Sequence, residues 1–395
     1  MLHRIETQAA PVRAGCPLNR WGLAMTETPI DVDESEDDAA RADVERDRAE
    51  LREFIKGLDA DDVKSGGWFS KLVAHALNSY TRKVDWQYFK EKYDGVPADG
   101  IVEQRIRMAS RYAALEGGLS AGAYSAAVVT TIGSLGSASP LTAPAAAVTF
   151  LVDLAYITQL QLRLAYDISV LYRIPLDLDD PDDLWKLVRV AFTIKTGELA
   201  REGVTKSVPF MVRPLVKQFY SKNVLATAKT LPVIGKYLLQ RNAIKVGIPL
   251  VGIPLAVVLN RYTTLVAGRH ARAIFRNEAR VIELAERLSS PCQYPQLMLW
   301  VAWLVITADN KISDDETLLM KHLVRVVRDQ HQVVDEELAN LVNIDPNDVW
   351  KRLAAESGDL TELLEVADRV ATVDGDITAR EKEIIAELRS RCRRI

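Results

Sequence analysis

One stretch of the sequence, from Gly117 to Val152, contains 36 residues without a charged side chain or a histidine. It is built of small and apolar residues, with Pro140 and Pro144 in its second half. Because proline interrupts helices, the stretch predicts a hairpin of two helices, each near the length that can cross or dip into a bilayer. The alternative is a small-residue hairpin at the core of a soluble domain, since Gly and Ala let helix backbones approach closely.

Charged residues return at Asp153, inside the second predicted helix at about 143–160. A buried carboxylate must be paired or neutralised. Arg163 lies on roughly the same helix face but about 15 Å away along the axis. We therefore expect a partner from another helix, such as one in the basic block at 185–290. Asp153 and Arg163 are candidates for buried polar or membrane contacts, either as structural pairs or as contacts to an ion or ligand.

Charge is unevenly distributed along the chain, although the formal net charge is only −4. Residues 31–62 carry 14 acidic and 5 basic side chains, 185–290 carry 18 basic and 5 acidic ones, and 291–395 carry 13 basic and 20 acidic ones. Such asymmetry suggests a surface for anionic partners, or segments that dock on each other. No recognised motif and no interleaved aromatic residues accompany the basic block, so no nucleic-acid partner is expected.

The rest of the sequence predicts an all-α protein, because strand-type alternation is almost absent. Apolar residues make up 48% and charged residues 26%, which excludes wholesale disorder. We expect a disordered N-terminal extension at 1–38 and a charged helix with a linker at 39–67. A helical domain with the small-residue apolar hairpin is predicted at 68–290, followed by a compact helical domain at 297–392.

The N-terminus and the cysteines favour a cytoplasmic location. The first residues lack the apolar region of a signal peptide, and Met25 is predicted to be the true start. Cys16, Cys292 and Cys392 are far apart, which fits a reducing compartment and provides no metal-binding pair. If the basic block binds headgroups, the protein lies peripherally on the inner face of the cell membrane.

Two C-terminal segments, TADNKISDDE at 307–316 and TVDGDITARE at 372–381, share acidic and hydroxyl residues in register. Ser or Thr followed three residues later by Glu is typical of a helix capping box, and Asp-Asn and Asp-Gly are typical of turns. The same residues could also offer oxygen ligands to a divalent cation such as Ca²⁺, although the spacing is not that of an EF-hand. The candidate ligands are Asp309, Glu316, Asp374, Asp376 and Glu381.

This repeated motif resembles the TerB-like tellurite-resistance domain, over about residues 297–392. The second copy carries the family pattern at Asp374, Gly375, Ile377 and Glu381. The first copy departs from it, with Asn310 where the family usually has glycine. The resemblance implies a compact helical domain with acidic clusters suspected of holding cations, and a link to membrane stress. It implies no established enzyme activity.

The preceding part, about residues 68–288, resembles the EcsC family. The resemblance rests on the small-residue run, the helix through Asp153 and Arg163, the Ile-Pro-Leu-Val-Gly segment at 248–252, and Asn260 in the helix after it. The family takes its name from a protein encoded beside an ABC transporter in some bacteria, so the resemblance names a class and not a mechanism. Asn260 joins Asp153 and Arg163 as a candidate buried polar or membrane-contacting residue.

The segment Gly118-Leu119-Ser120-Ala121-Gly122 matches the G-x-S-x-G pattern of hydrolase nucleophiles, and Asp153 and His270 follow in the hydrolase order. That motif requires a strand before it and a helix after it, whereas the residues before Gly118 are predicted to be helical. A segment rich in Ala and Gly also produces such matches by chance. A hydrolase that uses Ser120 is therefore the weaker alternative, and we expect no catalytic residues.

Together these patterns predict a non-enzymatic, membrane-associated accessory or regulatory protein of a bacterial envelope, transport or stress-response system. Its expected partners are anionic lipids of the inner membrane or a membrane transport complex, together with a protein that binds the acidic C-terminal module. The alternative is a soluble protein-interaction module without membrane contact, in which the basic block docks on an acidic segment of the same chain.

Overall fold

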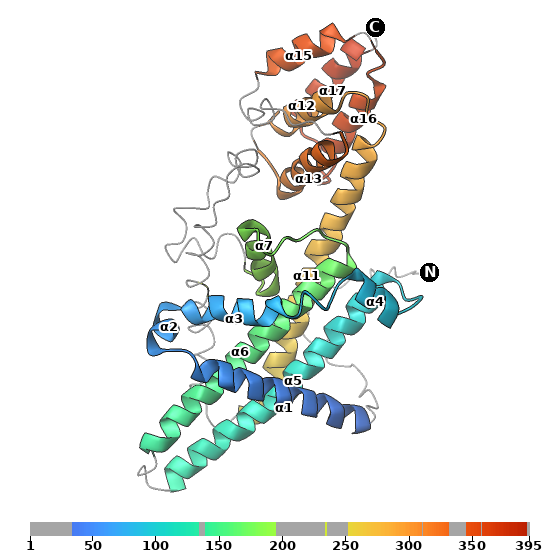
Figure 1. Ribbon diagram of the computed structural model, residues 1–395. Coiled ribbons are helices and arrows are strands. Elements are labelled where there is room, and N and C mark those ends of the chain that lie inside the picture. The colour runs from blue at the N-terminus through green and yellow to red at the C-terminus, as the bar shows by residue number, and fades with distance from the viewer. Residues whose placement is uncertain are drawn as a thin grey trace, which may run out of the picture.

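The protein is all-helical in the computed structural model, as the sequence predicts (Figure 1). The structure describes residues 34–133, 139–194, 234, 252–309, 311–331, 345–356 and 358–392, and no strand occurs among them. Two large parts of the chain lie outside the described residues. They are the extension up to residue 33, which contains Met25 and Cys16, and residues 195–251 of the basic block apart from residue 234.

Four helices of the N-terminal part pack around the longer helices that follow them. They are α1 (Glu34–Lys56), α2 (Ala60–Ser65), α3 (Gly67–Asn78) and α4 (Trp86–Lys92). α1 buries Val44, Leu51 and Ile55 on the face that meets α5 and α6. Residues 34–38 belong to α1 and are helical rather than disordered, because acidic residues are favourable at the positive end of the helix dipole.

The charge-free stretch forms the far ends of two long helices, α5 (Ala98–Gly133) and α6 (Ser139–Leu171), which lie side by side (Figure 1). α5 runs through Gly117 and Gly118 without a break, so the two helices predicted on either side of these glycines are one. α6 begins before Pro140, in the first turn, where a missing backbone N–H is tolerated. In Figure 1 the ends of both helices extend downward beyond α1.

A single helix of 38 residues, α11 (Gly252–Ser289), joins the two parts of the molecule. It runs antiparallel to α5, because Gly117 faces Ala256 while Gly268 faces Ile106. Residues up to Phe275 belong to the first hydrophobic core, which also contains α7 (Pro181–Ala191). From Val281 onward α11 belongs to a second core, formed with the C-terminal helices.

The C-terminal part is a compact group of helices around α12 (Pro295–Ile306). Every residue of α12 from Leu297 to Ile306 is buried, as expected for a helix that is apolar all round and packed on all sides. The surrounding helices are α13 (Asp314–His331), α15 (Pro346–Ala355), α16 (Thr361–Val370) and α17 (Ala379–Cys392). This part coincides with the region that resembles a TerB-like domain, and we call it the C-terminal module.

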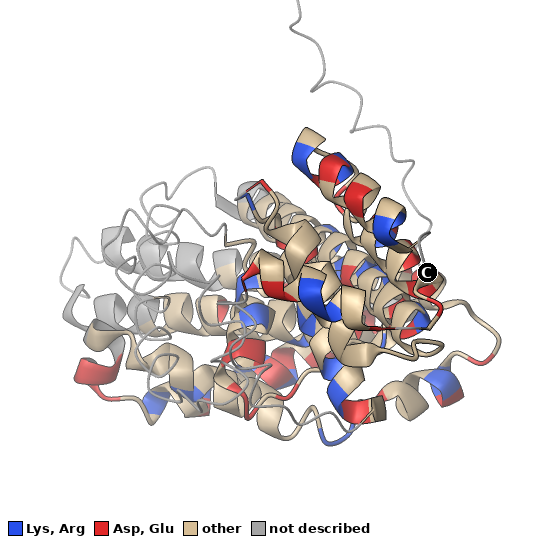
Figure 2. Cartoon of the chain, turned by 90° about the horizontal axis from the view of Figure 1, so that it is seen from above, with Lys and Arg blue, Asp and Glu red and all other residues tan. Residues whose placement is uncertain are grey.

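Basic and acidic residues are interspersed over the described helices, and the charge blocks of the sequence do not form separate halves (Figure 2). The reason is local pairing. In the described part of the basic block, Arg272 pairs with Glu103 of α5 and Lys186 pairs with Glu278 of α11 itself. In the described part of the chain, nearby carboxylates therefore neutralise part of the positive charge of the basic block. No ion pair among the described residues links the basic block to the acidic segment at 31–62.

The close approach of α5 and α11 predicts a site-specific loss of stability. A Cβ atom at Gly117 would lie 2.8 Å from the Ala256 carbonyl oxygen, and a backbone atom cannot move aside. We expect Gly117→Ala to lower the free energy of unfolding by about 1–3 kcal/mol in urea titrations, as overpacking does. Gly100→Ala, in the same helix, meets only the Val96 side chain at 3.2 Å and should be neutral or stabilising. Equal effects of the two would contradict this explanation.

Candidate functional site

Four helices each contribute one polar side chain to a cluster at the base of the hairpin. Glu116 of α5 lies at its centre and forms an ion pair with Arg48 of α1. The Asn260 amide of α11 donates to Glu116 Oε2 at 3.1 Å and contacts Asp153 Oδ1 of α6 at 3.4 Å. We call these four residues the base cluster. They tie α1, α5, α6 and α11 together at one level.

Three of the four side chains of the base cluster are buried and Asp153 is half-buried, and this burial sets the electrostatics of the cluster. The Glu116 side chain has no exposed surface, and Arg48 and Asn260 are 6% and 5% exposed. Burial raises the pKa of Glu116 well above its usual range, and the Asp153 carboxylate raises it further, while Arg48 acts in the opposite direction. One cation faces two acids, so a proton on Glu116 brings the formal charge of the cluster to zero. The raised pKa thus favours a protonated Glu116 inside the fold.

Two of the three residues predicted for a buried polar site come together here, and the third does not. Asp153 and Asn260 share the base cluster, and Asn260 is the expected partner from the basic block. Arg163 lies elsewhere: its Nε donates to the Ala76 carbonyl oxygen at 3.2 Å. Its guanidinium also lies 5.0 Å from the centre of the Tyr80 ring. Arg163 therefore anchors α6 to α3 instead of serving the hairpin.

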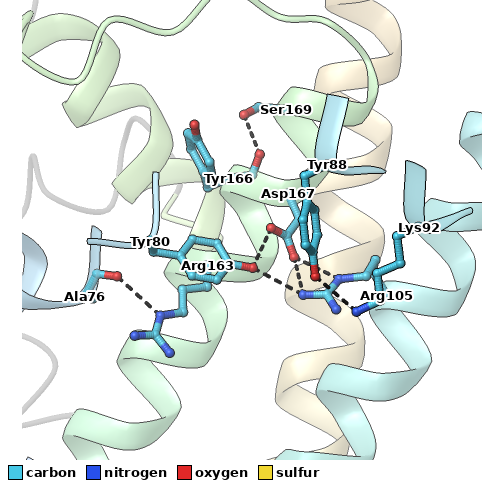
Figure 3. Close-up of polar contacts among 9 residues, drawn as sticks. All are labelled: Ala76, Tyr80, Tyr88, Lys92, Arg105, Arg163, Tyr166, Asp167 and Ser169. Carbon is cyan, nitrogen blue, oxygen red and sulfur yellow. Dashed lines mark hydrogen bonds and ion pairs between the residues drawn. The ribbon is translucent and has the colours of Figure 1, made fainter. Parts of the chain in front are cut away.

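A second polar cluster, about four helical turns after Asp153 along α6, is shown in Figure 3. Asp167 is fully buried and accepts from Arg105 Nε at 2.9 Å and from the Tyr80 hydroxyl at 2.7 Å. Arg105 also donates to the Tyr80 hydroxyl at 3.2 Å. Burial raises the pKa of Tyr80, which keeps the phenol protonated as a donor. This triad fixes the turn after α3 to α5 and α6, and it is a structural join.

A cavity of about 480 Å³ lies near this triad, between α3, α6, α7 and the turn that precedes α7. Its polar lining includes Asn78, Arg82 and Tyr166, and its apolar lining includes Leu77 and Leu184. The cavity has the volume of a small-ligand site. None of the residues that the sequence singled out as candidates lines it.

A third polar group joins the C-terminal module to α11. Glu278 of α11 is 2% exposed and pairs with Lys186 of α7 and with His322 Nε2 of α13 at 3.2 Å. Next to it, Asn277 donates to Asp315 at 2.7 Å. The acidic C-terminal module therefore contacts the basic block through Glu278, an acidic residue of that block, and through its own His322. Summed charge alone would not have predicted this arrangement.

Both predicted capping boxes form in the C-terminal module. Glu316 Oε2 accepts from the Ser313 backbone N–H at 2.7 Å, and the Ser313 hydroxyl accepts from the Glu316 N–H at 3.2 Å. Glu381 and Thr378 repeat the pattern, at 2.7 Å and 3.3 Å. The two glutamates thus satisfy free backbone donors at the starts of α13 and α17.

The three aspartates predicted as cation ligands, Asp309, Asp374 and Asp376, lie in turns before these helices. Asp309 accepts from the Lys311 N–H at 2.8 Å, and Asp374 accepts from the Asp376 N–H at 3.1 Å. Gly375 has φ +93°, which explains a glycine at this turn. Asp374 and Asp376 are exposed. The side chains of Asp309 and Asp374 therefore stabilise their turns.

The two acidic segments lie near each other. Burial raises the pKa of Glu316, and the charges of Asp374 and Glu381 add to that rise. Within the described residues, however, no three His, Cys, Asp or Glu side chains are grouped as metal ligands. The cation site at Asp309, Glu316, Asp374, Asp376 and Glu381 stays a prediction.

The hydrolase motif does not form its expected structure. Ser120 is a largely buried residue inside α5, with helix on both sides and no strand before it. A nucleophile elbow holds its serine on a sharp turn between a strand and a helix. The geometry that exposes such a serine is therefore missing at Ser120.

Sequence reasoning missed Arg48 and Glu116, the ion pair at the centre of the base cluster. Arg48 had a usable signal: it occupies the same helical row as Val44, Leu51 and Ile55, where only apolar side chains are expected. Glu116 is the last charged residue before the charge-free stretch. Which partner each residue has depends on tertiary packing.

Comparison with protein-family models matches no family to this chain. Comparisons with curated proteins and with solved structures also find no significant match. The likenesses to the EcsC family and to the TerB-like domain therefore stay predictions that rest on the quoted motifs. Among the described helices, none has the length and apolar content needed to cross a bilayer.

The raised pKa of Glu116 predicts how stability depends on pH. The folded chain keeps this proton at pH values where the unfolded chain, with a pKa near 4.5, has lost it. The contribution of this proton to the stability of the folded chain is complete below the unfolded-state pKa of about 4.5. It declines as the pH rises from there toward the higher folded-state pKa of Glu116. We expect Glu116→Gln, which mimics the protonated acid, to reduce this decline in urea titrations from about pH 5 to pH 8.

The matched control for Glu116→Gln is Glu45→Gln, which removes an exposed carboxylate of α1. It should leave the pH dependence of the wild-type chain unchanged. A Glu116→Gln chain that loses stability as steeply as the wild type would show that Glu116 is not the group responsible.

The capping role of Thr378 predicts a modest, local loss of stability. Thr378→Ala removes the hydroxyl that accepts from the Glu381 N–H, and such changes lower the free energy of unfolding by about 1 kcal/mol. The control is Ser390→Ala, because the Ser390 hydroxyl only donates to a carbonyl of its own helix. It should change stability by less than about 0.5 kcal/mol. Thermal unfolding at fixed pH compares the two, and equal losses would contradict the capping role.

Proposed function

We propose that this chain is a non-enzymatic, membrane-associated accessory or regulatory protein, and that the charge-free end of its α5–α6 hairpin enters an anionic membrane. The observation that carries the proposal is the position of this end. α5 continues past Glu116 to Gly133, and α6 begins at Ser139, before Asp153, with no Asp, Glu, Lys, Arg or His between Glu116 and Asp153.

The length of this end suits partial insertion. From Glu116 to Gly133, α5 adds about 25 Å of helix at 1.5 Å per residue. The hydrocarbon core of a bilayer is about 30 Å thick, so the hairpin end can pass the headgroups and reach the middle of the membrane. Because both arms are helical, their backbone hydrogen bonds are satisfied internally, as entry into lipid requires.

The base cluster supports the same orientation. It holds the last charges before the hairpin end and keeps them inside the protein, paired across four helices. Charged side chains are costly in the hydrocarbon region, and here they are confined to the level where the hairpin leaves the body. The boundary between body and membrane would then fall just beyond Glu116 and Asp153.

The two family resemblances support a role in a bacterial envelope, transport or stress-response system, at the inner face of the cell membrane. The expected partners are anionic lipids or a membrane transport complex. The C-terminal module would supply the regulatory part, by binding a protein partner or a divalent cation such as Ca²⁺. No reaction is assigned, and Ser120 is given no catalytic role.

A protein-interaction module without membrane contact is the second candidate. The docking of the C-terminal module on α11 through Glu278 and His322 favours it, because it shows how this chain joins two helical units by polar contacts. In that case the hairpin end would bind an apolar protein surface instead of lipid.

The test of the first proposal is flotation of the full chain with vesicles of phosphatidylcholine and phosphatidylglycerol. Val128→Asp and Val129→Asp each place one charge in the hairpin end, at two successive positions of α5. We expect each to weaken vesicle binding about 100-fold, because a carboxylate deep in the bilayer costs about 2.5–3.5 kcal/mol. Val96→Asp places the same charge at an exposed position outside the hairpin and is the control.

Far-UV circular dichroism shows whether each variant keeps its helices. A folded wild-type chain that does not float with anionic vesicles would reject the membrane proposal and favour the interaction module. So would flotation that the two hairpin variants leave unchanged.

A further inference from the structure

A row of apolar side chains is exposed along α11. Val258, Tyr262 and Val266 are 53%, 56% and 38% exposed. Among the described residues, four of the six exposed large apolar side chains lie on α11, these three and Ile274. Exposed apolar residues scattered singly need no explanation, whereas a contiguous row on one helix marks an interaction surface.

The row lies on one face of α11 together with two arginines. Residues four apart are neighbours on a helix surface, so Val258, Tyr262 and Val266 follow one another along that face. Arg269 lies eleven residues after Val258, which places it about 20° around the helix from Val258. Arg261 borders the row. We call Val258, Arg261, Tyr262, Val266 and Arg269 the α11 face.

The arginines of the α11 face differ from those further along the helix. Arg272 pairs with Glu103, and Arg276 lies 3.4 Å from an Asp99 oxygen. Arg261 and Arg269 are exposed, and neither has an ion-pair partner within the described part of the chain. α11 therefore changes along its length, from paired basic residues near the C-terminal module to unpaired ones beside an apolar row.

The local sequence supplies no acid to pair them. Residues 203–277 contain twelve Lys and Arg and not one Asp or Glu. A long basic segment without acids favours an anionic partner from outside the chain. A like-charged neighbour from the same segment would be repelled by Arg261 and Arg269.

The α11 face begins at the base of the hairpin. A Cβ at Gly117, the first residue of the charge-free stretch, would lie 2.8 Å from the Ala256 carbonyl oxygen, half a turn before Val258. α11 and the hairpin arms run along the same axis, since Gly268 packs against Ile106 and Leu164. If the hairpin enters a membrane obliquely, the α11 face can therefore contact the surface of the same membrane.

The chemistry of the α11 face fits a membrane surface better than a nucleic acid. Arginine binds phosphate groups, and tyrosine is enriched at the headgroup level, where one end is apolar and the other wet. Val258 and Val266 add apolar area that acyl chains can cover, whereas a phosphate backbone offers them no partner. Helices that lie in the membrane interface combine these features.

We infer that the α11 face lies on the headgroup layer of an anionic membrane, with Arg261 and Arg269 on lipid phosphates and the apolar row at the acyl boundary. Because α11 and the hairpin arms are nearly aligned, the hairpin then enters at a shallow angle, and its end stays closer to the headgroups than in an upright insertion. This inference rests on the proposed function and adds to it the surface that recognises the lipid charge. On this inference the α11 face selects anionic lipids, and the hairpin sets how deeply the protein inserts into the membrane.

The test measures partitioning of the full chain onto vesicles of phosphatidylcholine alone and of phosphatidylcholine with phosphatidylglycerol. The double variant Arg261→Gln/Arg269→Gln should bind the anionic vesicles about 30-fold more weakly, because each basic residue near such a surface contributes about a factor of five. On vesicles of phosphatidylcholine alone its binding should equal that of the wild type.

The matched control is Arg41→Gln/Arg287→Gln, which removes two exposed charges outside the α11 face. It should weaken binding less than about 3-fold, since charges farther than a Debye length from the lipid are screened. Tyr262→Asp tests the apolar row separately and should weaken binding at least 10-fold on the anionic vesicles. All these positions are exposed, and circular dichroism checks that each variant is folded.

The outcomes separate this inference from the function on which it rests. If the wild type floats, the hairpin variants fail to float and the α11 variants float normally, the inference is overturned and the proposed function remains. If the wild type does not bind anionic vesicles, both are overturned. If the α11 variants keep vesicle binding but lose self-association or RNA retention, the face serves that partner and the inference is overturned.

Discussion

The close antiparallel contact between α5 and α11 is the constraint on which the rest of the structure depends. Two glycines make it possible, Gly117 beside the Ala256 backbone and Gly268 beside Ile106 and Leu164. With larger residues at these points the helices would separate, and the base cluster would lose contact with Asn260. The first core would then open along α11, because Ala271 and Phe275 enter it from that helix.

The base cluster shows how this fold ends a charged region and begins an uncharged one. Isolated charges are expensive inside a protein, so Glu116 is held by a cation from α1 and an amide from α11. The second acid, Asp153, sits on the neighbouring arm of the hairpin. Beyond this level neither arm of the hairpin carries an Asp, Glu, Lys, Arg or His side chain.

Local rules predicted much of the fold. The all-α class and the capping boxes at Ser313 and Thr378 follow from short sequence patterns. Side-chain partners did not follow, because they depend on which helices meet. Arg163 and Asp153 are close in sequence and face different neighbours, while Arg48 and Glu116 are far apart and form an ion pair. The close contact of Gly117 with the Ala256 backbone of α11 did not follow either, for the same reason.

The continuity of α11 has a mechanical consequence. The helix is about 57 Å long at 1.5 Å per residue, and it passes from the first core to the second without a loop. A loop would let the two units rotate independently, whereas an unbroken helix transmits both torque and displacement. Because α11 is packed against α5 from Ala256 to Phe275, a force on the C-terminal module acts directly on the first core, with no loop to absorb it.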